Sequence, residues 1–170
     1  MSFDETIREL IRKIEKLELN ILVWGSGKSD RKNYQKRAKI RRELRKVFKN
    51  ADVRFSEDLD DSTTSPAKQH TSIPERELWH LAACDLCVVL DTSAGPAAEI
   101  AHFVASRYAH KLLVLTHKRY KNRSSFPASL REYTNQFFYS DEEFDSCSLV
   151  ELVADRARQV GLAELAQLRV

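Results

Sequence analysis

Hydrophobic residues along this chain recur with two alternating periods. Residues 4–17 carry a helical stripe, and residues 19–24 form a short apolar run of the kind found in buried strands. The same alternation continues through the chain and predicts helices at 4–17, around 40–48, at 73–84, 96–110, 127–135 and 148–160, and strands at 19–24, 52–58, 85–91, 111–117 and 136–140. Helices and strands that alternate in this way are typical of α/β proteins.

The run at 85–91 indicates the centre of the sheet. Its apolar residues do not alternate with polar ones, which predicts a strand buried on both faces, as in a parallel sheet. We therefore expect one domain spanning 1–170, a flavodoxin-like three-layer α/β sandwich with a five-stranded parallel sheet in the order 2-1-3-4-5. In that arrangement ligands bind at the carboxyl ends of the first and third strands.

Two loops follow those strands, and we expect them to face each other across one crevice. The loop after the first strand reads GSGKSD, at residues 25–30. It lacks the first glycine of a P-loop, and no clear helix is predicted to begin directly after Ser29, so we do not interpret it as a Walker nucleotide-binding site. Exposed backbone amides and side-chain donors would still suit a phosphate, and they come from Gly25, Ser26, Gly27, Lys28 and Ser29. A merely flexible turn is the competing interpretation.

The loop after the third strand leads to one carboxylate, Glu99. An acid in the first turn of a helix is stabilised by the helix macrodipole, typically by 0.3 to about 1 kcal/mol, and needs no other function. If Pro96 is the first helical residue, however, Ser93 and Glu99 do not have the spacing of a capping box. On the predicted helix Glu99 also leaves the apolar stripe and borders the crevice. The helix dipole would keep it ionised, as a nucleophile or oxocarbenium stabiliser requires.

The segment 77–103, ELWHLAACDLCVVLDTSAGPAAEIAHF, resembles the nucleoside 2-deoxyribosyltransferase family, including its deoxynucleoside 5′-monophosphate N-glycosidases. Ser93, Gly95 and Glu99 match the family's small-residue loop and nucleophilic glutamate, and Asp85 matches the acid that opens its strand. The resemblance implies cleavage or transfer of an N-glycosidic bond of a (deoxy)nucleoside or nucleoside 5′-monophosphate. Glu99 would attack C1′, and water or a second base would complete the cycle.

The chain departs from the family on the preceding helix. Glu77 stands where the family usually has aspartate, so the general acid is Glu77, Glu75 in its place, or absent. Asp91, at the end of the third strand, would bind a sugar hydroxyl or form a turn. Two other functions compete with the N-glycosidase: an NAD hydrolase of the TIR type and a non-catalytic nucleotide sensor. Family members generally work as oligomers, and the first helix offers an apolar stripe, so we expect a homodimer.

Composition narrows the remaining possibilities. Of the 170 residues 42% are hydrophobic and 31% charged, as in ordinary globular proteins, and no apolar run is long enough to span a bilayer. The N-terminus has no secretory apolar region, and three cysteines agree with a reducing compartment, so we expect a cytoplasmic protein. Cys84 and Cys87 fall on a predicted strand and would point to opposite faces of it, which argues against a shared metal or redox site. The five histidines have no ligand spacing. We therefore expect no metal and no cofactor.

Eleven basic residues lie between Lys28 and Lys49, against Asp30 and Glu43. Such a concentration could bind nucleic acid through its phosphates. Only Tyr34 is interleaved for base stacking, so we favour a solvated helix face, helped by contact with the acidic stretches SEDLDD and SDEEFD. The net charge of +3 does not decide between the two.

Overall fold

The computed structural model describes residues 2–60, 72–91, 100–121, 134–146 and 148–167. Their strands form one five-stranded sheet in the order β2-β1-β3-β4-β5, with every neighbouring pair parallel, as the sequence predicts. The strands are β1 (Asn20–Trp24), β2 (Asp52–Arg54), β3 (Leu86–Asp91), β4 (Leu112–His117) and β5 (Asn135–Tyr139). All six residues of β3 are buried, which confirms its place at the centre.

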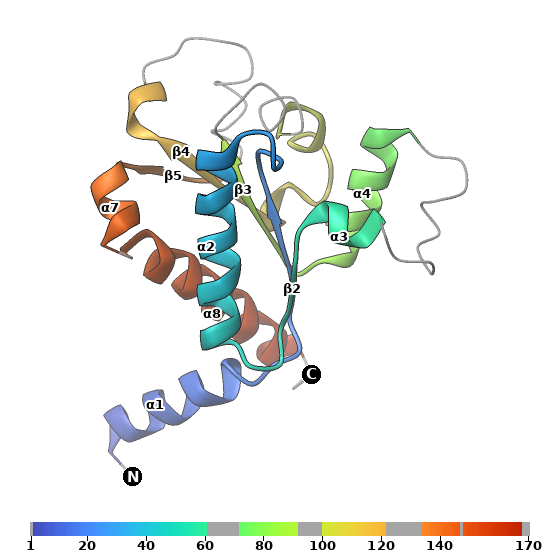
Figure 1. Ribbon diagram of the computed structural model, residues 1–170. Coiled ribbons are helices and arrows are strands. Elements are labelled where there is room, and N and C mark those ends of the chain that lie inside the picture. Colours follow the sequence, from blue (N-terminus) through green and yellow to red (C-terminus); the bar gives the residue numbers. More distant parts are fainter. Residues whose placement is uncertain (1, 61–71, 92–99, 122–133, 147, 168–170) are drawn as a thin grey trace.

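Helices cover both faces of the sheet (Figure 1). The described helices are α1 (Phe3–Ile14), α2 (Arg31–Val47), α3 (Ser56–Asp60), α4 (Ile73–Ala83), α7 (Asp141–Asp145) and α8 (Ser148–Gln167), with 3₁₀ turns η2 (Ala109–Lys111) and η3 (Lys118–Tyr120). In Figure 1, α2 and α8 lie on one side of the sheet, and α3 and α4 lie on the other. The result is the three-layer sandwich that the alternation predicts.

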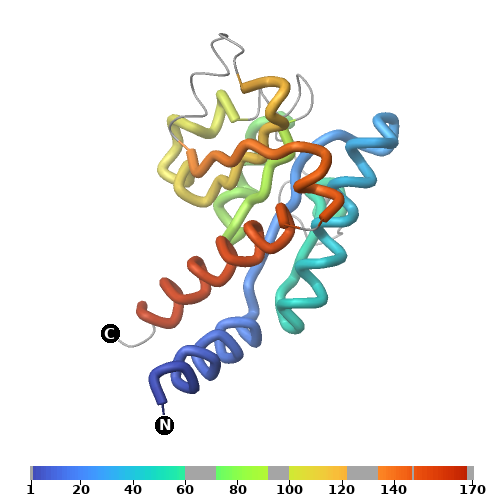
Figure 2. Tube along the Cα trace, turned by 90° about the vertical axis from the view of Figure 1, so that its left-hand side faces the viewer, coloured from blue at the N-terminus to red at the C-terminus, as the bar shows by residue number. Residues whose placement is uncertain are grey.

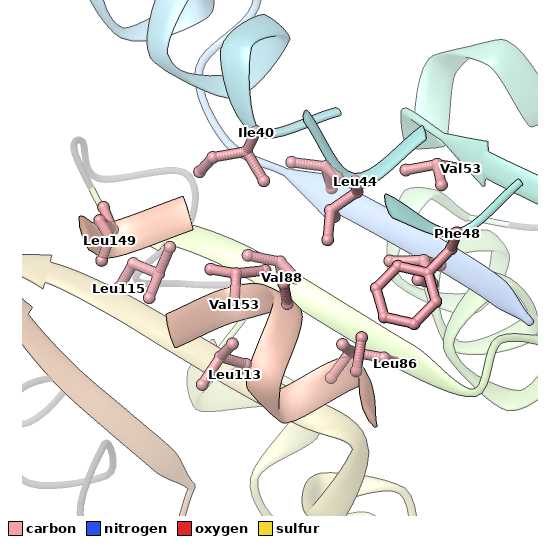
Figure 3. Packing of buried hydrophobic residues seen from close by; sticks show 14 of the residues in the cluster. Ile40, Leu44, Phe48, Val53, Leu86, Val88, Leu113, Leu115, Leu149 and Val153 are labelled. Atoms are coloured by element: carbon pink, nitrogen blue, oxygen red, sulfur yellow. The ribbon is translucent and has the colours of Figure 1, made fainter. Parts of the chain in front are cut away.

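The larger core lies between the sheet and the α2–α8 layer. Figure 3 shows Ile40 and Leu44 of α2 and Val153 of α8 packed around Val88 of β3. A second core on the other face holds Leu81 of α4 with alternate residues of the same strands. Because the strands bury both faces, the sheet is fixed in register from two sides, and the ends of its strands are held in place.

The second predicted strand is shorter than expected. It ends at Arg54, and residues 56–60 form α3 instead. Asp58 accepts a hydrogen bond from the backbone N–H of Phe55 at 3.0 Å and pairs with Arg41 at 2.8 Å. Local acidic side chains that bond the backbone favour a helical start over a strand, which explains the correction.

The helix predicted at 96–110 also ends early, because the described helical residues stop at Phe103. Ser106 closes a turn onto the carbonyl of Phe103, and its hydroxyl accepts the N–H of Tyr108 at 3.2 Å. This local bonding diverts the backbone from the helix, and the chain reaches β4 through η2.

Four further corrections concern the helices. The helix predicted around 40–48 begins earlier, because α2 starts at Arg31 behind the cap formed by Asp30. The helix predicted at 127–135 is wrong at Asn135, which begins β5; residues 127–133 lie outside the described part. A capping box between Ser140 and Glu143 begins α7, which was not predicted. The last helix continues beyond 160 to Gln167, through Gly161.

The first helix is confirmed in type but ends at Ile14, not at residue 17. Among the described residues no helix is both long and apolar enough to cross a membrane.

Candidate functional site

The carboxyl ends of β1 and β3 lie beside each other, because these strands pair in register from Ile21 with Leu86 to Trp24 with Val89. β1 is followed by Gly25, with φ +151°, a conformation that L side chains rarely adopt. A Cβ added to Gly25 would lie 3.2 Å from Cβ of Leu90. Glycine is therefore needed here both for its backbone angle and for close approach to β3.

The rest of the loop after β1 turns outward and then begins α2. Ser26 is buried, whereas Gly27, Lys28 and Ser29 are exposed. Asp30 caps α2 by accepting the backbone N–H of Asn33 at 3.3 Å, and it also accepts from the side-chain amide of Asn33 at 2.6 Å. That hydrogen bond is the main cause that lowers the pKa of Asp30. The loop thus presents Lys28 and Ser29 to solvent next to the start of a 17-residue helix.

At the end of β3, the side chain of Asp91 is 3% exposed. The hydroxyl of Thr116, its register partner on β4, donates to Oδ2 of Asp91 at 3.1 Å. The side-chain amide of Gln136, on β5, donates in turn to Thr116 at 3.3 Å. This chain across three strands fixes the Asp91 carboxylate. The Asp91 side chain is therefore held within the sheet.

Three of the predicted site residues, Ser93, Gly95 and Glu99, lie outside the described residues. The others are described: Gly25, Ser26, Gly27, Lys28 and Ser29 follow β1, Asp91 ends β3, and Glu77 lies half-buried on α4. The structure brings the glycine loop and the end of β3 to the same edge of the sheet.

Two acids from the predicted pattern have structural roles. Glu75 is exposed and accepts from both the backbone N–H and the hydroxyl of Ser72, at 2.8 and 2.9 Å. These bonds lower the pKa of Glu75 and favour the ionised form, which is unsuited to a general acid. Asp85 lies at the opposite end of β3 from Asp91 and accepts the N–H of Asn20 at 2.7 Å. It therefore ties the start of β3 to β1.

A second polar group lies at this edge, and its histidine and lysine were not among the predicted site residues. His117 ends β4 and packs edge-on against Tyr139 of β5, with ring centroids 5.3 Å apart. Lys36 of α2 lies 5.0 Å above the Tyr139 ring and pairs with Asp141. Burial raises the pKa of Tyr139 to about 12 and lowers that of His117. The sequence signal that could have identified this group is the polar residue at the end of an apolar strand, as in KLLVLTH.

The cysteine prediction needs correction in its geometry. Cys84 is the C-cap of α4 and does not lie on the strand, and both Cys84 and Cys87 belong to the second core. Burial raises the pKa of Cys84 to about 12, so its sulfur is a thiol and not a reactive thiolate.

Part of the basic run pairs with the acidic stretches, as predicted. Arg37, although 1% exposed, makes two hydrogen bonds to Glu57 and a third to the carbonyl of Val23 at 2.7 Å. Arg41 pairs with Asp58, and Lys32 and Lys36 pair with Asp141, whereas Arg42 and Lys46 pair with Glu43 inside the run itself. Arg37 thereby links α2 to the last residues of β1, beside the candidate site.

Comparisons with known proteins place the fold and the family. A solved structure of a conserved protein from Enterococcus faecalis V583 is similar over 82% of this chain and 99% of its own, with a TM-score of 0.55 and 15% identity. The Clostridium botulinum CMP N-glycosidase BcmB is similar over 76% of this chain and 98% of its own, with a TM-score of 0.46 and 15% identity. No curated protein matches the chain. The profile of the family described as STM3845 retron effector protein matches residues 33–154, well over half of the 170 residues, and the chain therefore belongs to that family.

Proposed function

We propose that this protein cleaves or transfers the N-glycosidic bond of a nucleoside or nucleoside 5′-monophosphate, with Glu99 as nucleophile. The observation that carries the proposal is the close approach of the glycine loop to the end of β3, where a Cβ on Gly25 would lie 3.2 Å from Leu90. The proposed reaction at that edge is taken from the resemblance of residues 77–103 to nucleoside 2-deoxyribosyltransferases. We propose this reaction as the activity through which members of the retron effector family act.

The proposed reaction divides the work among four groups. The Glu99 carboxylate attacks C1′ as the bond to the base breaks, and the base leaves with a proton from Glu77. Glu77 is assigned this role because Glu75 is occupied as a helix cap. Water or a second base then displaces the glutamate from C1′. Asp91, held by Thr116, accepts a hydrogen bond from a sugar hydroxyl, and Lys28 binds the 5′-phosphate.

The decisive experiment substitutes the nucleophile without changing its shape. Purified wild-type protein and the Glu99→Gln variant are incubated with nucleosides, nucleoside and deoxynucleoside 5′-monophosphates and NAD, and free base is measured by chromatography. We expect base release from the best substrate to fall at least about a hundredfold in Glu99→Gln, because the attacking charge is lost. Stability should fall by at most about 1 kcal/mol, the value of a first-turn charge.

A matched control is Glu151→Gln, which removes an exposed first-turn glutamate from α8. Glu151→Gln should lower the free energy of unfolding by a similarly small amount and keep its activity. Undiminished turnover in Glu99→Gln would reject this residue as the nucleophile. Release of nicotinamide alone would favour an NAD hydrolase. No base release from any substrate, together with a melting-temperature shift by a nucleotide, would favour a sensor.

A further inference from the structure

The first helix carries an exposed apolar face that the rest of the described chain does not cover. Phe3, Ile7 and Ile11 are 79%, 41% and 36% exposed. They follow each other at four-residue intervals, so each lies about 40° around the helix from the last and together they form one face. Among the described residues no other element carries three large exposed hydrophobic side chains.

This face belongs to a well-anchored helix. A capping box holds its first turn, with the N–H of Ser2 donating to Glu5 at 2.6 Å. At the other end Ile14 is buried in the larger core and packs at Gly161 of α8. Figure 2 shows α1 beside the C-terminal half of α8, with the N-terminal end of α1 farthest from the sheet. Anchoring at Ile14 leaves Phe3, Ile7 and Ile11 projecting from the body.

The charges on α1 indicate what covers the face. Its first turn holds the acids Asp4 and Glu5, and its last turn holds the bases Arg12 and Lys13. Two copies of α1 packed antiparallel would bring an acidic end against a basic end twice, and their helix dipoles would oppose each other. A parallel pair would place like charges together. The helix is therefore complementary to itself in the antiparallel orientation.

We propose that this protein forms a two-fold symmetric dimer through antiparallel α1 helices, with the symmetry axis at Ile7. Ile7 then packs on Ile7 of the second copy, and Phe3 packs on Ile11 of the second copy. Asp4 and Arg8 lie on the same flank of the apolar face, one turn apart. In an antiparallel pair this flank meets its own copy, so Asp4 faces Arg8 of the second copy, and the contact occurs twice.

The size of this contact sets its strength. A helix of 12 residues is about 18 Å long, so the seam is smaller than a standard interface of about 800 Å² per partner. We therefore expect a dissociation constant on the order of 1–100 µM for the dimer.

Sedimentation equilibrium of the full chain tests the proposal across that range. Wild type should pass from monomer to dimer, whereas Ile7→Asp should stay monomeric. Ile73→Asp, which changes an exposed isoleucine on α4 (63% exposed), is the matched control and should dimerise as wild type does. A wild type that stays monomeric, or an Ile7→Asp variant that still dimerises, would overturn the proposal.

Charge exchange tests the orientation. Asp4→Arg and Arg8→Asp should each weaken the dimer at least about tenfold, because each places like charges together at two symmetric contacts. The double variant should recover most of the affinity. Equal affinity of all three variants and wild type would overturn the antiparallel register.

Cross-linking tests the same interface by forming a bond across it and not by disrupting it. Ile7→Cys sits on the symmetry axis and should form a disulfide-linked dimer under mild oxidation, since facing Cα atoms at such a position come within disulfide range. Phe3→Cys faces Ile11 and should cross-link poorly alone. A reversed pattern would contradict the axis at Ile7.

Discussion

At the scale of single residues, the two acids of β3 show how alike side chains acquire different roles. Asp85 precedes the strand and accepts the backbone N–H of Asn20, whereas Asp91 ends it and is held by Thr116. In parallel strands the amino ends meet at one edge and the carboxyl ends at the other, so the two acids lie at opposite edges. Only Asp91 shares an edge with the glycine loop. The strand-opening acid thus ties β3 to β1, and Asp91 is the acid to which our proposal assigns a role in binding.

Lys28 offers a test of phosphate binding at the same edge. It is exposed, and no partner for its side chain lies among the described residues. If it binds a 5′-phosphate, Lys28→Ala should weaken nucleoside monophosphate binding by roughly 1.5–3 kcal/mol, the value of a charge-assisted hydrogen bond, and leave nucleoside binding unchanged. Isothermal titration with both ligands measures the difference. Lys49→Ala is a control at the far end of the same basic run, and equal weakening of both ligands in Lys28→Ala would count against a phosphate contact.

At the scale of elements, sheet order and the central strand followed from the sequence because buried parallel strands leave a strong pattern. Element ends were less well predicted where side chains decide them, as at Asp58 and Ser106. The position of the glycine loop was predicted, since strand order determines it. The Asp91–Thr116–Gln136 chain was not, because contacts across three strands depend on register, which the pattern of one strand does not contain.

Gly161 shows how packing overrides a local signal. A glycine near the end of an apolar stripe suggests the end of a helix, yet α8 continues through it. A Cβ there would lie 2.7 Å from Cγ2 of Ile14 and 3.2 Å from Cδ1 of Leu17, so the position must stay small for α1 to dock.

We expect Gly161→Ala to lower the free energy of unfolding by about 1–3 kcal/mol through overpacking, despite a gain of up to about 1 kcal/mol in helix propensity. In an Ile14→Ala background the same change should become neutral or stabilising, because the clashing methyl group is gone. Urea denaturation of the four proteins gives the coupling energy. Equal costs in both backgrounds would mean that the contact with Ile14 does not determine the effect.

At the scale of the whole molecule, charge is organised in pairs that join the layers. Arg37 connects α2 with β1 and α3, and Lys36 connects α2 with the start of α7. Arg158 of α8 pairs with Glu15 just beyond α1. Most of these carboxylates are partly exposed, so the individual pairs are weak, but together they make stability depend on pH.

The direction of that dependence follows from two groups of residues that titrate in separate ranges. Burial lowers the pKa of His117; Asp141 opposes this, whereas Lys36, Arg119 and Lys32 add to it. The unfolded chain, with a histidine pKa near 6.5, therefore binds a proton before the folded chain does as pH falls. The lowered pKa values of Asp141, held by Lys36, and of Glu143, held by Lys118, act below about pH 4.5. Their contribution is present above that range and is lost as pH falls through it.

We expect the free energy of unfolding, measured by urea denaturation from about pH 7.5 to 3, to fall first below about pH 6.5 and again below about pH 4.5. His117→Asn should make the upper decline shallower and leave the lower one unchanged, because it removes the proton that only the unfolded chain accepts. His110→Asn is the control: His110 is exposed, and its replacement should leave both declines in place. If the upper decline is as steep in His117→Asn as in wild type, then burial of His117 at the end of β4 does not determine how this protein responds to mild acid.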